Sequence, residues 1–348
     1  MALKVTARKA ARILKCALLP NRPHHVQWLI TRRCNYRCRG CNVWREQNDI
    51  EELTTDEIKK GLDILRGLGT IEIVFSGGAP LLREDIDEIL EYASRYFVTT
   101  VYDNGSLVLE KIDALRNVDF VAISLDSLNP KVNDYIKGVK GSWKKAMEAI
   151  ETLHEEGISV CVSPTISQLN LYEIVDYTKH FLARNIPVLY CLYSYDLPVE
   201  SEQLFNIGRE NDEFKIVDRD AMVKVCDELI QLKKNSSRML ITIKTLEAIK
   251  QLFLTGERTW KCRALSNFLM IDHLGRVAGC HIRGPVTTIF ELPEVWDSKE
   301  FDRLRSIYRE CKGCTYLCYI FYSIHSGLSG NFEIVRENWK NAKILLSS

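Results

Sequence analysis

Cys34, Cys38 and Cys41 are separated by three and then two residues and follow the apolar run 26–30. Three thiolates from one tight loop can each hold one iron of a cubic [4Fe–4S] cluster. The fourth iron then has no protein ligand and can bind a small molecule directly. A cluster that only carries electrons normally has four cysteines. From these residues alone, a zinc site that lacks its fourth ligand is the alternative.

A second motif, Ser-Gly-Gly-Ala-Pro at residues 76–80, follows the apolar strand expected at 71–75. Together with the cysteine loop it resembles the signature of the radical S-adenosylmethionine (SAM) superfamily, which carries Gly-Gly-Glu-Pro at this point. Gly40 stands where that family usually has an aromatic residue, and Ala79 stands where it has the glutamate. Neither residue is an iron ligand, so these departures concern the contacts with the adenine and methionine parts of SAM.

The resemblance implies that Cys34, Cys38 and Cys41 hold the catalytic cluster and that nearby residues of both motifs contact SAM. These SAM-contact candidates are Tyr36, Gly40, Ser76, Gly77, Gly78 and Ala79.

Strand-like and helix-like runs alternate from residue 26 to about 195. The expected strands are 26–31, 71–75, 98–102, 119–124, 159–165 and 187–193, and helical patterns include 54–68, 84–96, 142–154 and 171–184. Thr54 and Glu57 are a candidate capping box at the start of the first of these helices. Such alternation predicts an α/β fold with a parallel sheet and right-handed crossovers, whose reactive loops lie at the carboxyl ends of the strands. The resemblance implies a partial (β/α)6 TIM-like barrel over residues 22–235 and a small C-terminal α+β iron–sulfur domain over 236–348.

Polar residues follow several of these strands, where they can reach a ligand at the rim of the barrel. Lys137 stands where relatives often have an arginine near the SAM carboxylate. The rim candidates for SAM contact are Asp103, Asn104, Ser124, Asp126, Lys137 and Ser163. The alternative for each is a turn or cap residue. Tyr190 and Tyr193, in the sixth strand, are candidates to line a substrate cavity, and core packing is their alternative.

Five further cysteines lie near the C-terminus: Cys262, Cys280, Cys311, Cys314 and Cys318. A hairpin over 268–279, with its turn at 272–275, separates the first two. By spacing alone, four thiolates could hold either tetrahedral zinc or a second cluster. The Cys-x12-Gly-x4-Cys element resembles the SPASM and twitch extensions of radical SAM enzymes, which implies an auxiliary [4Fe–4S] cluster held by four of the five cysteines. His281, beside Cys280, is a candidate contact of this cluster, and the alternative, which we expect, is a surface side chain.

The N-terminal residues 1–21 contain a basic amphipathic helix, expected over 3–19. Its basic side carries Lys4, Arg8, Lys9, Arg12 and Lys15. Such a helix suits an anionic membrane surface, at roughly 1 kcal/mol per basic residue. The alternative is a helix that closes the bottom of the barrel with its charges in water. The net charge of +1 gives no indication of nucleic-acid binding.

The chain has twelve cysteines but no apolar run long enough to span a bilayer and no export signal. Cysteines in a reducing compartment are typical of metal ligands, so we expect a cytoplasmic protein, peripheral at the inner face of the membrane.

The resemblance implies that an electron donor of the ferredoxin or flavodoxin type reduces the first cluster. SAM is then cleaved to methionine and a 5′-deoxyadenosyl radical, which abstracts hydrogen from an unactivated C–H bond. Our first hypothesis for the substrate is a membrane-lipid alkyl chain, with carbon–carbon bond formation. It rests on the basic helix and on a looser resemblance to lipid-acting enzymes of the hopanoid and archaeal tetraether kinds. The alternatives are maturation of a ribosomal peptide or protein residue, and a non-enzymatic zinc or iron–sulfur scaffold.

Overall fold

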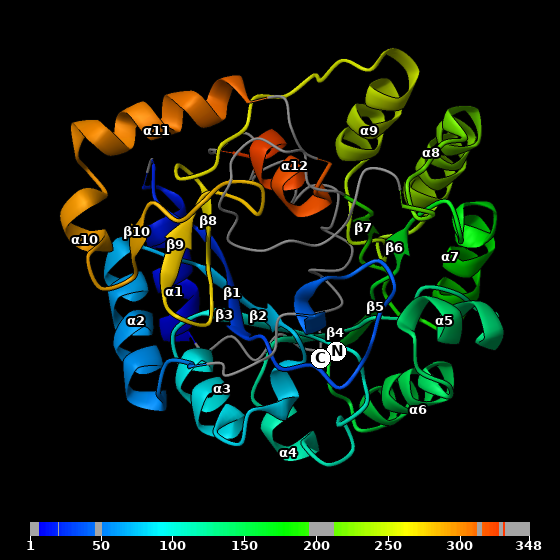
Figure 1. Ribbon diagram of the computed structural model, residues 1–348, viewed down its shortest axis with the longest axis horizontal. Helices are drawn as coiled ribbons and strands as arrows, with labels where there is room; N and C mark the ends of the chain where they lie inside the picture. Colours follow the sequence, from blue (N-terminus) through cyan, green and yellow to red (C-terminus); the bar gives the residue numbers. More distant parts are fainter. Residues whose placement is uncertain are drawn as a thin grey trace.

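The computed structural model describes residues 7–19, 21–45, 51–194, 212–311, 315–326 and 330. Its main sheet has eight strands in the order β10-β9-β8-β1-β2-β3-β4-β5. Figure 1 shows the strands inside an arc of helices, with α12 within that arc. The strands are β1 (His25–Thr31), β2 (Glu72–Gly77), β3 (Val98–Asp103), β4 (Phe120–Ile123), β5 (Val160–Val162), β8 (Phe268–Ile271), β9 (Arg276–Ala278) and β10 (Thr287–Thr288).

The first five strands pair in parallel and in chain order, as the alternating sequence pattern predicts. The sixth run continues the series through a parallel bridge between Val162 and Val188. A second, two-stranded sheet joins β6 (Thr165–Ile166) to β7 (Cys191–Leu192). The cysteine loop after β1 and the glycine motif at the end of β2 therefore lie at the same edge of the sheet.

The helices between the strands form the outer layer. They are α2 (Thr55–Leu68), α3 (Ile86–Ser94), α4 (Ile112–Leu115), α5 (Pro130–Lys137), α6 (Ser142–Glu155), α7 (Ile174–Ala183) and α8 (Arg219–Asn235), with short 3-10 turns η1 (Val43–Arg45), η2 (Pro80–Leu82) and η3 (Leu171–Glu173). The capping box expected at α2 is present, because Thr54 and Glu57 exchange side-chain and backbone hydrogen bonds. Trp28 of β1 packs against Gly61 of this helix, where a Cβ atom would lie only 2.6 Å from the indole.

The C-terminal residues extend the barrel sheet. The predicted hairpin is confirmed as β8 and β9, with Gly275 at φ +77° in its turn. However, β8 also pairs in parallel with β1, so the hairpin covers an edge of β1 that would otherwise be unpaired. The helices of this part are α9 (Ile243–Thr255), α10 (Leu292–Val295), α11 (Lys299–Glu310) and α12 (Leu317–Ile324).

The N-terminal helix α1 (Ala7–Ala17) docks on the amino end of the barrel. Lys9 is 5% exposed and its Nζ lies 2.6 Å from Asp119 Oδ2. Arg12 donates hydrogen bonds to the carbonyls of Thr70 and Tyr96, and its guanidinium lies over the ring of Phe97. Contrary to the expectation that the charges face water, these two basic residues are bound by the barrel.

The amino end of the sheet explains this docking, because the residues just before β2, β3 and β4 present carbonyls and one carboxylate there. Lys4 lies outside the described residues. Within the described part of the chain, none of the helices combines the length and apolar character needed to cross a bilayer.

Candidate active site

The cysteine loop leaves β1 over the glycine motif. The backbone N–H of Gly78 donates to Thr31 O, and that of Ala79 donates to Arg33 O, each at 2.8 Å. A Cβ atom at Gly78 would lie 2.1 Å from Arg33 O, and one at Gly77, where φ is +133°, would lie 2.2 Å from Thr31 O. Both positions therefore need glycine, because the two backbone segments lie in direct contact.

The other side of the loop rests on the end of α5. The backbone N–H groups of Arg37 and Arg39 donate to the carbonyls of Lys137 and Ile136. Gly138 permits this approach, since a Cβ atom there would lie 2.1 Å from Arg37 O. The loop is thus held between two glycine-bearing segments that the sequence places about 60 residues apart.

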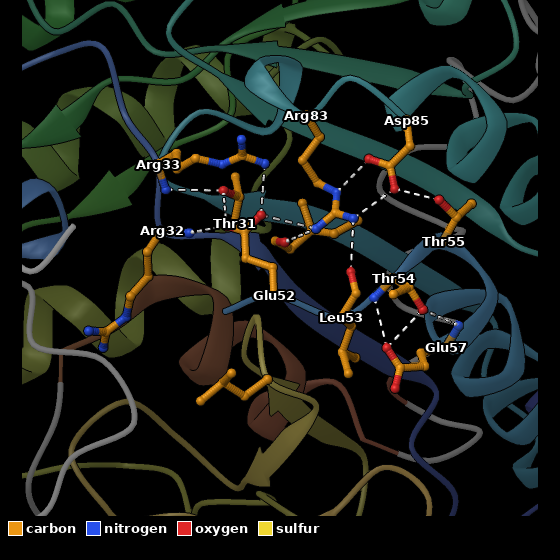
Figure 2. A network of polar contacts seen from close by, with 12 residues as sticks. Thr31, Arg32, Arg33, Glu52, Leu53, Thr54, Thr55, Glu57, Arg83 and Asp85 are labelled. Carbon is orange, nitrogen blue, oxygen red and sulfur yellow. Dashed lines mark hydrogen bonds and ion pairs between the residues drawn. The ribbon is translucent and has the colours of Figure 1, made fainter. Parts of the chain in front are cut away.

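A buried ion-pair network fixes the start of the loop (Figure 2). Arg83 donates to the carbonyls of Ile30 and Leu53, at 3.1 and 3.0 Å, and pairs with Asp85 at 2.7 Å. Glu52 pairs with Arg83 and accepts hydrogen bonds from the Thr31 hydroxyl and the backbone N–H of Arg32. We call these residues the Arg83 clasp. The sequence analysis missed it, because lone charged residues 31 positions apart carry no local pattern.

The three thiols of the loop share one environment. Burial raises the pKa of Cys38 to about 12 and that of Cys41 to about 11; Cys34 and Lys137 also act on both pKa values, and Cys41 acts on that of Cys38. Burial likewise raises the pKa of Cys34, which Lys137 and Asp103 also influence. These mutual effects place the three cysteines and the Lys137 amine around one site.

This donor set fits a cubic cluster. A zinc ion needs all its thiolates at about 2.3 Å from one point. Among the described residues, no group of three or more His, Cys, Asp or Glu side chains has an arrangement that could hold a single metal ion. A cubane gives each thiolate its own iron, so Cys34, Cys38 and Cys41 need not converge on one centre.

Three rim candidates come together as the sequence predicts. Lys137 Nζ lies 2.7 Å from Asp126 Oδ2 and 2.6 Å from Ser124 Oγ. Burial alone would lower the pKa of Lys137, but Asp126 and Cys38 outweigh it and the net shift is upward. The site therefore contains a buried ammonium, suited to a carboxylate ligand, beside the thiols. Contact of these residues with SAM stays a prediction.

Two more rim candidates, Asp103 and Asn104, have local structural partners. Asp103 accepts hydrogen bonds from the backbone N–H of Gly105 and Leu81, while burial raises its pKa to about 6. Asn104 donates to the Asn35 side chain at 2.9 Å. Both residues thus form turns at the rim, which was their alternative role.

Other candidates for SAM contact lie deeper. Ser76 Oγ accepts from the Gln27 amide at 3.1 Å, and Ser163 Oγ lies 3.6 Å from Cys191 Sγ. Tyr36 is buried, burial raises its pKa, and its hydroxyl has no hydrogen-bond partner among the described residues.

The inner face of the sheet is covered by α12 and carries polar groups. Tyr322 of α12 stacks on His25 at 3.7 Å between ring centroids and donates to Glu72 Oε2 at 2.6 Å. His25 Nδ1 lies 3.0 Å from the same oxygen. Burial alone would raise the pKa of Glu72, but His25 and Tyr322 outweigh it and the pKa is lowered. The sequence analysis missed this network, which joins residues about 250 positions apart.

The prediction that Tyr190 lines the interior is wrong. Its hydroxyl lies 2.8 Å from Thr178 Oγ1 in α7, on the outer side of the sheet. Side chains alternate along a strand, so positions 190 and 193 cannot share a face. Tyr193 instead packs on Gly40 and on Phe214, at 5.2 Å between ring centroids.

The C-terminal cysteines lie in aromatic surroundings. Cys262 and Cys280 both contribute to the raised pKa of Tyr308, whose largest cause is burial, so both lie near that phenol. Cys318, in the first turn of α12, acts in the same way on Tyr102 and Tyr322. Cys311 caps α11, where its carbonyl accepts from Arg258. Cys314 lies outside the described residues.

His281, expected at the surface, is 2% exposed. Its ring lies 4.4 Å from that of Tyr316 and 5.4 Å from that of Tyr319. His281 is buried because the hairpin carries the residues after Cys280 beneath α12 instead of into solvent.

A model of the radical SAM superfamily matches residues 28–171, the part that contains the cysteine loop, the glycine motif and Lys137. Residues 28–171 of the chain form a radical SAM domain. Radical SAM proteins use a [4Fe–4S] cluster and SAM, and this chain is an enzyme of that kind.

Two curated relatives show how far the likeness extends. An AdoMet-dependent heme synthase of Methanosarcina barkeri is 27% identical over 321 residues, which cover 86% of this chain and 89% of the relative. The subtilosin biosynthesis protein AlbA of Bacillus subtilis is 31% identical over 159 residues, but these cover only 44% of this chain and 36% of the relative. The second match therefore spans little more than a third of that protein.

Solved radical SAM structures share the fold of nearly the whole chain. The enzyme anSMEcpe, solved with bound AdoMet and a peptide, aligns over 93% of this chain and 99% of its own, with a TM-score of 0.61 and 13% identity. SuiB of Streptococcus suis, bound to its precursor peptide SuiA, aligns over 93% of this chain and 75% of its own, with a TM-score of 0.64 and 16% identity. The C-terminal elements described above thus belong to a fold that these solved structures share.

Proposed function

We propose that this radical SAM enzyme acts on an amino-acid residue of a peptide or protein, the second of the substrate hypotheses above. The observation that carries the proposal is the polar character of the inner face of the sheet. His25, Gln27 and Glu72 lie there with Tyr102, and Tyr322 of α12 covers them. Peptide groups can hydrogen-bond to such a lining, for example at Gln27 Oε1, which has no hydrogen-bond partner among the described residues, whereas a saturated alkyl chain cannot.

In this proposal Cys34, Cys38 and Cys41 hold the cluster, and Lys137 binds the carboxylate of SAM. When bound, the cluster and SAM supply a 5′-deoxyadenosyl radical that removes a hydrogen atom from the substrate. The chain orients the peptide on the inner face of the sheet, and α12 excludes water from it. We further propose that an electron donor of the ferredoxin or flavodoxin type reduces the cluster and that the enzyme works in the cytoplasm.

We also propose that the C-terminal cysteines hold an auxiliary [4Fe–4S] cluster. Cys262 and Cys280 supply two ligands, and two of Cys311, Cys314 and Cys318 supply the others. The buried aromatic surroundings of Cys280 support this, because a dry shell of this kind tunes the potential of a cluster and limits its exposure to solvent.

A lipid substrate gains no support from the relatives described above. Membrane attachment through α1 also loses part of its basis, because Lys9 and Arg12 of its basic side bind the barrel.

A second candidate function is tetrapyrrole chemistry. It is favoured by the alignment with the heme synthase, which extends over 89% of that relative, against 36% for AlbA.

Anaerobic reconstitution followed by reduction tests the proposal. We expect about eight irons per chain, release of 5′-deoxyadenosine from SAM, and loss of that release in Cys38→Ala. Deuterium from a peptide pool labelled at its C–H bonds should enter the 5′-deoxyadenosine. Titration with Fe-coproporphyrin III separates the alternatives: deuterium transfer without a change in the porphyrin spectrum supports peptide maturation, and a saturable spectral change without deuterium transfer contradicts it.

A further inference from the structure

We propose that Tyr193 and Ser194, which directly follow β7, form a junction that positions both cysteine centres. The Tyr193 ring rests on Gly40, next to Cys41, and the Ser194 hydroxyl holds Thr315, which follows Cys314 directly. The inference rests on the proposed auxiliary cluster and deepens it, because it names the residues through which that cluster and the SAM cluster are placed relative to each other.

The first contact occurs at the backbone of the cysteine loop. A Cβ atom at Gly40 would lie 2.9 Å from Tyr193 Cε2 and 3.2 Å from Phe214 Cδ2. The two rings therefore occupy the space that a side chain at position 40 would need. This explains why Gly40 departs from the aromatic residue expected there, since Tyr193 and Phe214 supply aromatic rings at the same place.

The Tyr193 ring is held in one orientation. It is 7% exposed, and it stacks on Phe214 with an angle of 29° between the ring planes. Its hydroxyl donates to Asp212 Oδ2 at 3.0 Å, and the other oxygen of Asp212 accepts from the backbone N–H of Phe214. A ring fixed at its face and at its hydroxyl is a rigid support for the Gly40–Cys41 backbone.

The second contact lies one residue further along the chain. Ser194 Oγ lies 2.8 Å from Thr315 Oγ1, which also donates to the carbonyl of Tyr193 at 3.5 Å. Ser194 is buried, and Thr315 stands between Cys314 and Cys318 in the sequence. The backbone N–H of Tyr193 donates to Ile166 O, which ties the junction to β6.

The consequence is a shared support for two sets of ligands. The residues behind metal ligands set the orientation and the hydrogen bonding of those ligands, and these in turn set the reduction potential. A change in the Tyr193 ring should therefore alter both clusters, whereas a change in the Ser194 hydroxyl should alter the auxiliary cluster first.

The experiment uses the full chain, reconstituted anaerobically, with electron paramagnetic resonance (EPR) spectra and redox titrations of both clusters, with and without SAM. Tyr193→Leu should shift the spectrum and the potential of both clusters, and Ser194→Ala should shift those of the auxiliary cluster alone. Tyr193→Phe keeps the ring and should restore both clusters to near the wild-type values. Tyr190→Phe is the matched control, because it removes a tyrosine hydroxyl from the opposite face of the same run and should shift neither.

A second experiment tests the contact at Gly40 by adding a side chain there and then removing the ring that it would meet. Gly40→Ala should lose more than half of the SAM-responsive signal, and Gly40→Ala combined with Tyr193→Ala should regain part of it, because the ring that the new Cβ meets is gone. Thermal melting of each variant shows whether it is folded.

Two results would overturn the proposal in distinguishable ways. A wild-type chain with only about four irons refutes the auxiliary cluster and the junction with it. A wild-type chain with both clusters, in which folded Tyr193→Leu leaves either cluster unshifted, refutes the junction alone.

Discussion

At Gly40 and at Gly279, each directly before a cysteine, a tyrosine ring occupies the place of the missing side chain. A Cβ atom would lie 2.9 Å from the Tyr193 ring at Gly40 and 2.5 Å from the Tyr308 ring at Gly279. The two cysteine centres of the chain therefore use the same packing device, in which an aromatic ring supports the backbone just before a metal-ligand candidate.

The surroundings of the two centres differ. The surroundings of Cys41 are charged and partly open, and they include the buried ion pair of Lys137 and Asp126. Around Cys280 they are aromatic and closed: the neighbouring His281 is buried among tyrosines, and burial lowers its pKa to about 3, so the imidazole is neutral. Surroundings of the first kind suit a charged small molecule, and surroundings of the second kind suit a group that is kept away from water.

The largest expected effects are those of cysteine substitutions, which should remove iron from one centre at a time and stop SAM cleavage at the first centre only. Cys38→Ser should remove about four of about eight irons and abolish the release of 5′-deoxyadenosine. Cys280→Ser should remove a similar amount of iron and leave SAM cleavage in place, because it does not touch the first centre. Iron analysis and quantification of 5′-deoxyadenosine check both, and loss of SAM cleavage in Cys280→Ser would mean that the centres are not separate.

The Arg83 clasp should matter for the first centre only. Arg83→Met leaves Glu52 and Asp85 without their buried partner and should cost about 3–5 kcal/mol in the free energy of unfolding. Loss of the SAM-responsive EPR signal should accompany it, with the auxiliary signal unchanged.

Arg33→Gln is the matched control for Arg83→Met, because its side chain is half exposed although it also pairs with Glu52. It should cost at most about 1 kcal/mol, as measured by urea unfolding. Equal losses in the free energy of unfolding for Arg83→Met and Arg33→Gln would show that burial does not strengthen the ion pairs of the Arg83 clasp.

The glycines beside the two centres should differ in how well they tolerate replacement by alanine. Gly78→Ala meets a backbone oxygen and should cost about 1–3 kcal/mol or more, whereas Gly279→Ala meets the edge of a side-chain ring that can shift, so its cost should be smaller. Gly67→Ala, in the last turn of α2 with open space around it, should stabilise the protein by about 0.5–1 kcal/mol. Thermal melting ranks the three variants, and a Gly279→Ala cost above that of Gly78→Ala would reverse the comparison.

A small effect is also expected at Tyr190. Tyr190→Phe removes one buried hydrogen bond to Thr178 and should cost about 0.5–1.5 kcal/mol. The rate of 5′-deoxyadenosine release should not change, because the residue faces α7 and lies outside the interior. A clearly slower release of 5′-deoxyadenosine by the folded variant would indicate that Tyr190 lines the substrate site after all.

Local patterns predicted much of this structure. The cysteine spacing and the glycine pair placed the first centre, and the Thr54–Glu57 pair placed the start of α2, because each is encoded within a few residues. The parallel pairing of β8 with β1 could not be predicted in this way, since it joins His25 to Phe268. The same holds for the Arg83 clasp.

The N-terminal helix shows a different limit. Its amphipathic pattern identified a basic side, but the pattern does not say what that side faces. Asp119 and the carbonyls before the strands decide this, and they come together only in the folded barrel. At Tyr190 and Tyr193, the strand was predicted but the alternation of its faces was misapplied.

The most direct test of two separate centres is the EPR spectrum of the reduced variant in which Cys34, Cys38 and Cys41 are all changed to alanine, recorded with and without SAM. The account predicts one remaining [4Fe–4S] signal that SAM does not alter. A spectrum without any cluster signal, or a remaining signal that shifts when SAM is added, would contradict it.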